Sequence, residues 1–438
     1  YQEPNTGIRE KWQYNNFMFL TQGMIAEKIS GKSWEENIKE KIFTPLGMSR
    51  SNLSIKDMEK DGDASLGYGL KKDSSVKKLG YFNIDGMGPA GSINSSVTEM
   101  ANWVITWINN GKFNGKEVLP ESYIREAISA QMAIGGALPD KEQPDIYFSN
   151  YGLAWFLSSY RGHYRVEHGG NIDGFSASTS FFPADSIGII VLTNQNASAI
   201  PSVLRNMIAD RMLKLKYKNW SNDRKMAIAK LALQAKEAEK NKTSNRVPDT
   251  KPSHPLADYK GLFNNPGYGD IEIYSKNDSL FARTNKDSLW LRHYHYDVFE
   301  VKGFDKEDGL DTSSGGTVLN FRTSDDGKIG SLSITLEPSL KPIAFVFKPK
   351  PKVLSVEELQ KYVGEYELGS MTTKVYLKGE TLFVFVPGQP EYETIALGDH
   401  TFKLKVLDGY SVKFDVTDDK VTGMDFIQPN GVFRAKRK

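Results

Sequence analysis

Residues 14–48 read YNNFMFLTQGMIAEKISGKSWEENIKEKIFTPLGM, and this stretch decides the fold that the rest of the sequence supports. Apolar residues recur at helical spacing after Tyr14, which predicts a helix over residues 16–29. Ser33, followed three residues later by Glu36, forms a capping-box pattern and predicts a second helix that stops at Pro45. Two helices joined by a short polar connection are therefore expected here.

The composition is that of an ordinary globular protein with more than one domain. The chain has 438 residues, of which 39% are hydrophobic and 11% aromatic, and this length suits about two to four domains. Lys and Arg number 56 against 54 Asp and Glu, so no electrostatic footprint for nucleic acid is predicted. The absence of cysteine excludes disulfides, a thiolate nucleophile and Cys-ligated metals. No apolar run reaches the ~18 residues of a membrane span.

The first half of the sequence predicts helices followed by antiparallel strands. Further helices are expected from Ser96 to about Gly111, again with a capping-box pattern at Ser96 and Glu99, and over residues 121–128. Short aromatic or β-branched runs separated by Gly, Asp and Pro then predict a strand meander over residues 151–157, 163–167, 175–182 and 187–193. A helix opened by Pro201 follows. This order indicates a layered α+β domain.

The second half contains an internal duplication. Residues 223–242 are rich in helix formers and predict a linker helix, and residues 243–253, with two prolines, mark a boundary. Beyond it, Leu256-x-x-Tyr259-x-Gly261 recurs as Leu359-x-x-Tyr362-x-Gly364, at an offset of 103 residues. A solenoid repeats every ~20–50 residues, so we expect two small antiparallel β-barrels instead. The predicted domains are residues 1–216, a linker over 217–253, and barrels over 254–350 and 351–438.

Tyr14 and Asn16 form the first candidate site. A phenol has a pKa near 10 and accepts a serine proton only when a nearby cation lowers that value. The carboxamide of Asn16 both donates and accepts hydrogen bonds, which suits it to orient a substrate amide. The structural alternative is a tyrosine that packs its ring at the start of a helix, with an asparagine as N-cap. The flanking sequence favours catalysis.

His168-Gly169-Gly170 forms the second candidate site, at the end of a predicted strand. Two residues without Cβ let a strand edge lie against a substrate backbone and pair with it. The amide of Asn171, directly after them, is placed to serve as an oxyanion-hole donor. The alternative is a turn with two glycines and a surface histidine.

These motifs resemble those of the serine β-lactamase-like and penicillin-binding-protein superfamily. The resemblance covers about residues 1–215 and includes residues 88–101, GPAGSINSSVTEMA, which are similar to the Pro-Ala-Gly-Gly segment before a scaffold helix. His168 stands where β-lactamases have the Lys of K-T-G, as in the H-x-G form of D-aminopeptidases and related esterases. The resemblance implies a β-lactamase-like antiparallel sheet with helices, incomplete here, followed by the two barrels.

The resemblance also implies a reaction. The S-x-x-K motif of the superfamily belongs upstream of Tyr14, so we expect this chain to be the C-terminal part of an exported, extracytoplasmic enzyme whose signal peptide is also upstream. Its serine attacks a carbonyl, with its lysine and Tyr14 sharing the proton work, while Asn16 and residues 168–171 hold the substrate. Expected substrates are short peptides with D-residues, their amides or esters, or β-lactams. No cofactor or metal is expected, and the chain alone should be nearly inactive. The alternative is a binding or regulatory protein that keeps the fold without the nucleophile.

Two other sequence patterns contain residue types that occur in catalytic or metal sites. Ser74-Ser75-Val76-Lys77-Lys78 contains S-x-x-K twice, but its charged surroundings indicate a loop where the motif requires a helical turn. His293 and His295 fall on one face of a predicted strand, a geometry that metals use, yet only Asp297 is nearby as a further ligand. Neither pattern is favoured as a site.

Overall fold

The structure is a computed structural model, which describes residues 4–438 except 72–73, 135–138, 140, 142–143, 241–244, 285–287, 306–308, 312–315, 326, 338–339 and 408. The chain divides into two units, Thr6–Lys242 and, chiefly, Thr243–Lys438. Residues 241–244 of the predicted linker, which include the end of its predicted helix, lie outside the described residues. The domain boundaries predicted from the sequence stay predictions.

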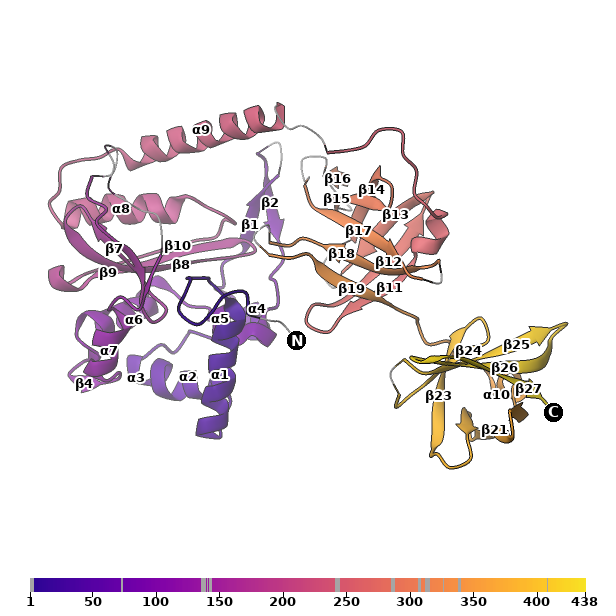
Figure 1. Cartoon of the computed structure of the whole chain (residues 1–438). Coiled ribbons are helices and arrows are strands. Elements are labelled where there is room, and N and C mark those ends of the chain that lie inside the picture. The colour runs from indigo at the N-terminus through magenta and orange to yellow at the C-terminus, as the bar shows by residue number, and fades with distance from the viewer. Residues whose placement is uncertain are drawn as a thin grey trace. The chain divides into compact units, whose positions relative to one another are not determined.

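An antiparallel sheet with strand order β10-β9-β8-β7-β6-β5 is the centre of the N-terminal unit (Figure 1). Its strands are β5 (Met132–Ala133), β6 (Ser149–Tyr151), β7 (Phe156–Tyr160), β8 (His163–Ile172), β9 (Phe175–Phe182) and β10 (Ile187–Thr193). Each strand pairs with the next along the chain. The predicted meander is confirmed.

The prediction of one strand over residues 151–157 is wrong. Residues 152–155 turn the chain between β6 and β7, and the Gly152 amide donates to the Trp155 carbonyl at 2.8 Å. A Cβ on Gly152 would lie 2.1 Å from the carbonyl oxygen of Ala127. The turn therefore packs so closely on the preceding helix that only glycine fits, a tertiary contact that the aromatic run does not reveal.

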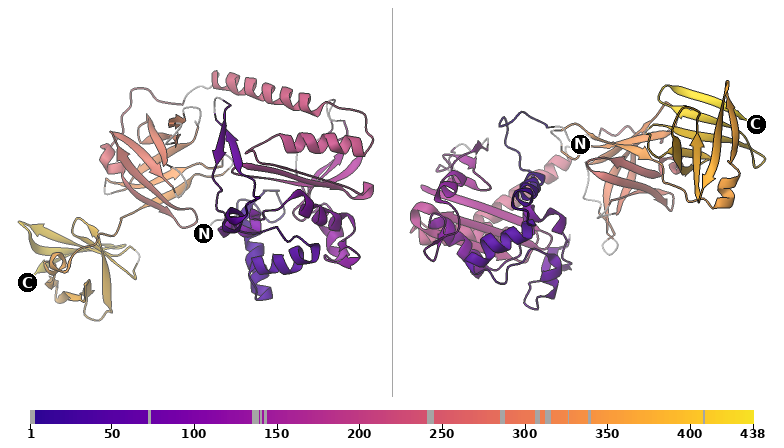
Figure 2. Two further views of the ribbon diagram at one scale, coloured as in Figure 1. Left: turned by 180° about the vertical axis from the view of Figure 1, so that it is seen from behind. Right: turned by 90° about the horizontal axis from the view of Figure 1, so that it is seen from below.

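Helices cover both faces of this sheet (Figure 2). The helices of the unit are α1 (Asn16–Ser30), α2 (Trp34–Ile38), α3 (Thr44–Leu46), α4 (Ile55–Lys60), α5 (Gly88–Gly91), α6 (Val97–Ile108), α7 (Glu121–Ala127), α8 (Ile200–Met212) and α9 (Trp220–Lys240), with a π-helical turn over Lys39–Phe43. Phe181 packs with Trp107 of α6, whereas its neighbour Phe182 packs with Ala209 of α8. Because successive strand residues face opposite sides, α6 and α8 lie on opposite faces. The layered α+β prediction is confirmed.

Short hairpins complete the N-terminal unit. They are β1 (Gly67–Leu70) with β2 (Val76–Leu79), and β3 (Lys112–Phe113) with β4 (Lys116–Glu117). Ser75 directly precedes strand β2, and Lys78 lies within it. This S-x-x-K match therefore has no helical turn to bring the two side chains together. The expectation of a loop was wrong for residues 76–79, while the exclusion of a helical motif agrees with the structure.

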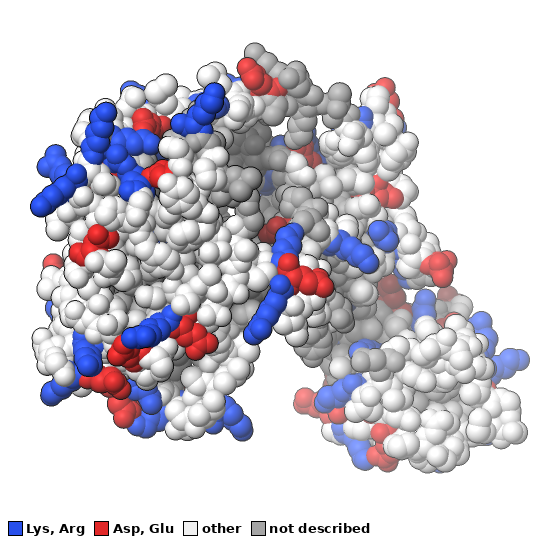
Figure 3. All heavy atoms as spheres, turned by 60° about the vertical axis from the view of Figure 1, so that its left-hand side comes forward, with Lys and Arg blue, Asp and Glu red and all other residues white. Residues whose placement is uncertain are grey.

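The described part of the chain contains no candidate membrane helix, and the sequence has nearly equal numbers of positive and negative residues. No helix in the described part of the chain has both the length and the hydropathy that a bilayer crossing requires. Figure 3 shows Lys and Arg side chains interspersed with Asp and Glu on the face that it draws, in keeping with the nearly balanced charge.

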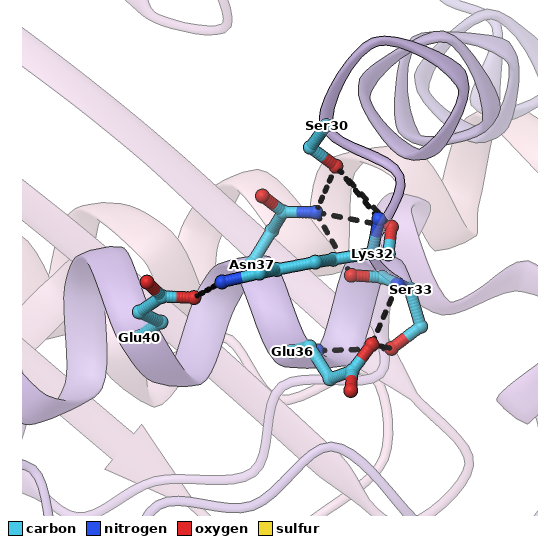
Figure 4. Close-up of polar contacts among 6 residues, drawn as sticks. All are labelled: Ser30, Lys32, Ser33, Glu36, Asn37 and Glu40. Atoms are coloured by element: carbon cyan, nitrogen blue, oxygen red, sulfur yellow. Dashed lines mark hydrogen bonds and ion pairs between the residues drawn. The ribbon is translucent and has the colours of Figure 1, made fainter.

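The connection between α1 and α2 is fixed by polar contacts (Figure 4). The Ser33 amide donates to Glu36 Oε2 at 2.8 Å and the Glu36 amide donates to Ser33 Oγ at 3.1 Å, so the predicted capping box is confirmed. Asn37 Nδ2 donates to Ser30 Oγ at 2.8 Å, and Lys32 pairs with Glu40. These contacts stabilise the angle between the two helices.

The second predicted capping box forms only in part. The Glu99 amide donates to Ser96 Oγ at 3.3 Å, but the Glu99 carboxylate turns away from Ser96. It accepts the amides of Arg50 at 2.9 Å and Ser51 at 2.8 Å and the Ser51 hydroxyl at 2.6 Å. Glu99 therefore ties the loop after α3 to α6, a long-range role that local spacing cannot predict.

The C-terminal unit begins with a closed antiparallel barrel. A 3₁₀ turn over Leu256–Tyr259 precedes its strands. The strands are β11 (Gly261–Asn265), β12 (Gly269–Lys276), β13 (Ser279–Arg283), β14 (Ser288–His295), β15 (Val298–Asp305), β16 (Gly309–Asp311), β17 (Val318–Thr323), β18 (Ile329–Ile334) and β19 (Ile343–Lys348). Pairing of β14 with β15 closes the barrel, and β16 adds to β15.

A second closed barrel follows, preceded by α10 (Val356–Gln360). Its strands are β20 (Gly364–Leu368), β21 (Met371–Lys378), β22 (Thr381–Phe385), β23 (Glu391–Gly398), β24 (Thr401–Leu404), β25 (Ser411–Thr417), β26 (Lys420–Gln428) and β27 (Gly431–Arg437). Pairing of β20 with β27 closes the ring. The prediction of two antiparallel barrels is confirmed.

The two barrels share a tyrosine-to-turn hydrogen bond. Tyr259 and Tyr362 are buried, with 0% and 3% of their surface exposed. The Tyr259 hydroxyl donates to Asp297, between β14 and β15, and the Tyr362 hydroxyl lies 2.7 Å from His400 Nδ1, between β23 and β24. Both partners lie 38 residues beyond their tyrosine. The repeated sequence signature thus marks a repeated contact.

Candidate functional site

Tyr14 lies directly before α1, with 40% of its surface exposed. Asn15 is the N-cap of the helix, because its Oδ1 accepts the amides of Phe17 at 2.8 Å and Met18 at 3.3 Å. Asn16 is the first helical residue; its side chain is exposed and forms no hydrogen bond with the described residues. The capping role thus falls to Asn15 and leaves the Asn16 carboxamide available to a ligand.

The fold brings Tyr14 to the strand that carries the two glycines. The rings of Tyr14 and His168 are 6.0 Å apart, and His168 lies in β8. The two predicted elements, separated by most of the N-terminal unit, are therefore neighbours.

Residues 168–172 of β8 form a free strand edge. Pairing with β7 ends where Phe156 faces Glu167, whereas pairing with β9 continues to Ile172 opposite Phe175. The two-residue turn after Ile172 makes that last pair a hydrogen-bonded one, and antiparallel pairs alternate. The backbone N–H and C=O groups of Gly169 and Asn171 therefore point away from β9, toward the free edge.

The two glycines differ in what surrounds them. A Cβ on Gly169 would lie 3.1 Å from the carbonyl oxygen of Ala177, whereas a Cβ on Gly170 would meet no atom within 4 Å. Strand alternation puts Gly170 on the same face as His168. The fold thus leaves open space beside Gly170, on the face where Tyr14 lies near His168.

A hollow of about 310 Å³ adjoins the same strand end. It is lined by Gly169, Gly170, Asn171, Ser176, Ala177, Ser178, Ala197, Ser198, Pro201, Ser202 and Arg205. Tyr14 and His168 are not among these residues. The structure thus groups the two glycines with Asn171 in one hollow, which Tyr14 and His168 do not line.

The Asn171 side chain holds the end of β8 in place. Its Oδ1 accepts the Ala197 amide at 2.6 Å and the Ser176 hydroxyl at 2.7 Å, and its Nδ2 donates to Asn196 at 3.0 Å. These contacts use the side chain and leave the backbone amide at the free edge. The role of this amide as an oxyanion-hole donor stays a prediction.

Glu167 anchors the strand just before His168. Its carboxylate pairs with Arg165 at 2.9 Å and with Arg205 of α8, and the side chains of all three are largely buried. Breaking a buried pair by removing one partner leaves an uncompensated charge. This network therefore fixes the start of the free edge.

His168 is oriented by hydrogen bonds on both ring nitrogens. Its Nδ1 lies 2.7 Å from the Gly169 carbonyl oxygen, which only accepts, so Nδ1 carries the proton. In the neutral ring Nε2 then accepts, and the Tyr151 hydroxyl lies 3.4 Å from it. Burial, and then the neighbouring Tyr14, raise the pKa of the Tyr151 hydroxyl far above its usual value, so it stays a proton donor.

The surroundings of Tyr14 favour the neutral form of its hydroxyl. Burial raises the pKa of its hydroxyl, and no charged side chain of the described chain offsets this. A tyrosine acts as a general base only when a cation lowers its pKa. The geometry thus supplies a placed hydroxyl and still requires a cation to activate it.

Sequence reasoning missed three aromatic residues of this site, Trp12, Tyr151 and Phe156. Trp12 lies 5.8 Å from Tyr151 and 5.9 Å from Phe156, and Phe156 lies 5.3 Å from His168, measured between ring centroids. The signal available was the Trp-x-Tyr spacing before α1. Their convergence depends on strand register, which the sequence does not give.

The histidine pair in the first barrel forms no metal site with the described residues. A shift of register separates His293 from His295, so the simple alternation expected for this pair is interrupted. His293 Nε2 lies 2.9 Å from the Tyr296 carbonyl oxygen, and His295 Nδ1 accepts the Val247 amide at 3.2 Å. Among the residues that the structure describes, no group of three or more His, Asp or Glu is placed to hold a metal ion.

Family comparison agrees with this geometry. Residues 2–210 match the model of the Beta-lactamase family. This N-terminal region is therefore β-lactamase-like. Residues 245–347, which contain the first barrel, match a domain of unknown function, DUF3471.

Individual relatives cover different parts of the chain. An unguisins hydrolase of Aspergillus campestris is 25% identical over 359 residues, which are 78% of this chain and 64% of that protein. The chain therefore spans less than two thirds of that relative. The octameric penicillin-binding protein homologue of Pyrococcus abyssi is 19% identical with a TM-score of 0.44, over 77% of this chain and 65% of that one. A D-stereospecific amidohydrolase of Streptomyces is 21% identical with a TM-score of 0.37, over 44% and 54%.

Proposed function

We propose that this chain is the substrate-binding part of a serine hydrolase that acts through an acyl-enzyme on short D-residue peptides, their amides or esters, or β-lactams. The observation that carries the proposal is the position of Tyr14 beside the free edge of β8. The matched Beta-lactamase family and the hydrolase among the relatives support the same class of reaction.

The reaction begins with attack of a serine Oγ on the substrate carbonyl carbon. The serine proton passes to Tyr14, whose pKa a lysine ammonium nearby would lower. The tetrahedral oxyanion accepts the Asn171 amide at the free edge. Collapse breaks the bond to the leaving amine or alkoxide, which takes up the proton. Water then attacks the ester, giving the carboxylic acid and restoring the serine.

One side chain and one stretch of backbone hold the substrate in this scheme. The exposed Asn16 carboxamide receives a substrate amide, and the backbone groups of Gly169 and Asn171 at the free edge pair with an extended substrate, beside Gly170. His168 supports substrate binding mainly indirectly. Its hydrogen bond to the Gly169 carbonyl fixes the strand that binds the substrate. We propose that the serine and lysine come from polypeptide outside residues 1–438, that this chain alone is nearly inactive, and that the enzyme works outside the cytoplasm.

A second function is favoured by one observation. The pKa of the Tyr14 hydroxyl is raised by burial, with no described cation to lower it, which suits a protein that binds its ligand without chemistry. In this alternative the same edge and hollow serve a non-catalytic binding or regulatory role.

Trapping of the acyl-enzyme distinguishes the two functions. The 438-residue chain, and the chain joined to its proposed nucleophile segment, are incubated with a β-lactam and a D-alanyl ester and examined by intact mass spectrometry and peptide mapping. We expect an acyl adduct on a serine of the joined segment and none on the chain alone. An adduct on a serine within residues 1–438, or no adduct on either protein, contradicts the proposal.

A further inference from the structure

Five aromatic rings lie close together near the first residue of β7 and the free edge of β8. We call Trp12, Tyr14, Tyr151, Phe156 and His168 the aromatic platform. Ring centroids lie 6.4 Å apart for Trp12 and Tyr14, 4.9 Å for Tyr151 and Phe156, and 6.0 Å for Tyr14 and His168. These separations are typical of aromatic contacts. The platform therefore includes the tyrosine to which catalysis is assigned.

The platform is partly open to solvent. Tyr14 is 40% exposed, and the other members are neither fully buried nor fully exposed. Trp12, Tyr14, Tyr151 and Phe156 carry no formal charge at neutral pH. A partly exposed set of rings of this size leaves apolar surface in contact with water, which an apolar ligand group removes.

The neighbouring strand sets the direction from which a ligand approaches. A substrate strand paired with Gly169 and Asn171 lies about 4.8 Å from β8, and its side chains alternate between the two faces. Residues that face the same way as His168 meet the rings, and the vacant space beside Gly170 leaves room for them. An extended substrate thus presents every second side chain to the platform.

We propose that the aromatic platform is a subsite for an aromatic side chain of the substrate, on a residue next to the scissile carbonyl. This inference rests on the proposed function and adds the substrate class. Ring-on-ring contacts favour aromatic over small side chains, and the lack of a charged partner in the platform disfavours acidic ones. A basic side chain is the main competitor, because rings also attract cations.

Binding measurements on the 438-residue chain test the subsite without requiring turnover. The probes are the N-acetyl amides of D-phenylalanine, D-alanine, D-glutamate and D-lysine, each titrated at one ionic strength and followed by calorimetry or ligand-observed NMR. We expect the phenylalanine amide to bind at least about 10-fold tighter than the alanine amide, since even one methylene in an apolar pocket is worth ~10–200-fold. Tightest binding of the lysine amide, or equal binding of the phenylalanine and alanine amides, including no binding of either, overturns the inference.

Variants connect the preference to the platform. Trp12→Ala removes a ring from the segment before α1. Phe156→Leu removes a ring at the start of β7 and keeps an apolar side chain there. Both should lower the preference for the phenylalanine amide several-fold while the alanine amide binds as before. Tyr217→Ala is the matched control, because Tyr217 is 75% exposed and lies outside the platform. Full preference in both platform variants, with melting temperatures near that of the parent, contradicts the subsite.

The outcomes separate this inference from the proposed function. If the aromatic preference is found but no protein forms an acyl adduct, the subsite stands and the reaction fails. If adducts form with no aromatic preference in binding, the reaction stands and the subsite fails.

Discussion

The ring of Tyr14 lies 6.0 Å from the ring of His168, which joins the start of α1 to the free edge of β8. Two short motifs from distant parts of the N-terminal unit thereby share one site. Neither motif is informative alone, because a Tyr-x-Asn at a helix start and a His-Gly-Gly at a strand end are common structural patterns. Their adjacency, together with the edge at Gly169 and Asn171 that no described strand pairs, is the basis of the proposal that they share a function.

Gly170 is expected to matter for ligands and not for folding. Gly170→Val should leave the melting temperature nearly unchanged, since its Cβ meets no atom within 4 Å and β-branched residues suit strands. The new side chain fills the space beside His168, so the N-acetyl-D-alanine amide should bind about 10-fold or more weakly, the effect of ~1–3 kcal/mol of steric conflict.

Gly188→Val is the matched control for that change. A Cβ on Gly188 would lie 2.4 Å from a methyl carbon of Val104. Overpacking typically costs ~1–3 kcal/mol, so this variant should lower the melting temperature of the N-terminal unit. A destabilised Gly170→Val, or one that binds the amide as tightly as the parent, contradicts the assignment of the open space to ligand.

Glu99 should make the N-terminal unit sensitive to acid. Burial raises the pKa of its carboxyl, but hydrogen bonds from Ser51 and from the amides of Arg50 and Ser51 outweigh burial, so the pKa lies below its ordinary 4.5. A carboxyl whose pKa is lowered in the folded state stabilises the fold at pH values above its ordinary pKa. This stabilisation is lost as the pH falls through the folded-state pKa. Glu99→Gln should cost ~1–3 kcal/mol at neutral pH and weaken the fall in stability below about pH 5.

Thermal unfolding between pH 3 and 7 measures that effect. Glu121→Gln is the control, because Glu121 pairs with Arg125 on the exposed surface of α7. Equal acid sensitivity in the parent and in Glu99→Gln would show that Glu99 does not carry the linkage.

The two barrel tyrosines should differ in their contribution to stability. Tyr259 donates to the Asp297 carboxylate, and the pKa of that carboxyl is lowered because this and other hydrogen bonds outweigh its burial. Tyr362 bonds to an imidazole. Hydrogen bonds to charged groups are worth ~1.5–3 kcal/mol against ~0.5–1.5 for neutral ones, so Tyr259→Phe should destabilise its barrel more than Tyr362→Phe does.

Hydrogen exchange resolved by barrel checks this difference in the whole chain. At neutral pH, β11–β19 should lose more protection in Tyr259→Phe than β20–β27 lose in Tyr362→Phe. The difference between the two losses of protection should become smaller as Asp297 becomes protonated at low pH. Equal losses at neutral pH would mean that the carboxylate adds nothing to the tyrosine-to-turn contact.

Local patterns in the sequence predicted much of the fold. The Ser33 and Glu36 capping box, the strands at residues 175–182 and 187–193, and the paired Leu-x-x-Tyr-x-Gly signatures all appear where expected. Each depends on contacts between residues close in sequence or on a repeated pattern, which spacing alone records.

What the sequence did not predict depends on long-range contacts. Glu99 bonds to Ser51 across 48 residues instead of closing its own capping box. The turn at residues 152–155 follows from the close approach of Gly152 to Ala127. The aromatic platform needs the register that starts β7 at Phe156, opposite Glu167. No periodicity in the sequence encodes these three features.

The most direct test of the central claim is the steady-state rate of Tyr14→Phe in the chain joined to its nucleophile segment. The change keeps the ring in the platform and removes only the hydroxyl. On a D-phenylalanyl amide, an ester and a chromogenic β-lactam, kcat/KM should fall by ~10²–10⁴-fold, the usual loss when a proton-transfer group is removed. The melting temperature should change little, and His168→Ala should lower kcat/KM less. An unchanged kcat/KM for Tyr14→Phe on every substrate that the parent hydrolyses would contradict the catalytic role of Tyr14.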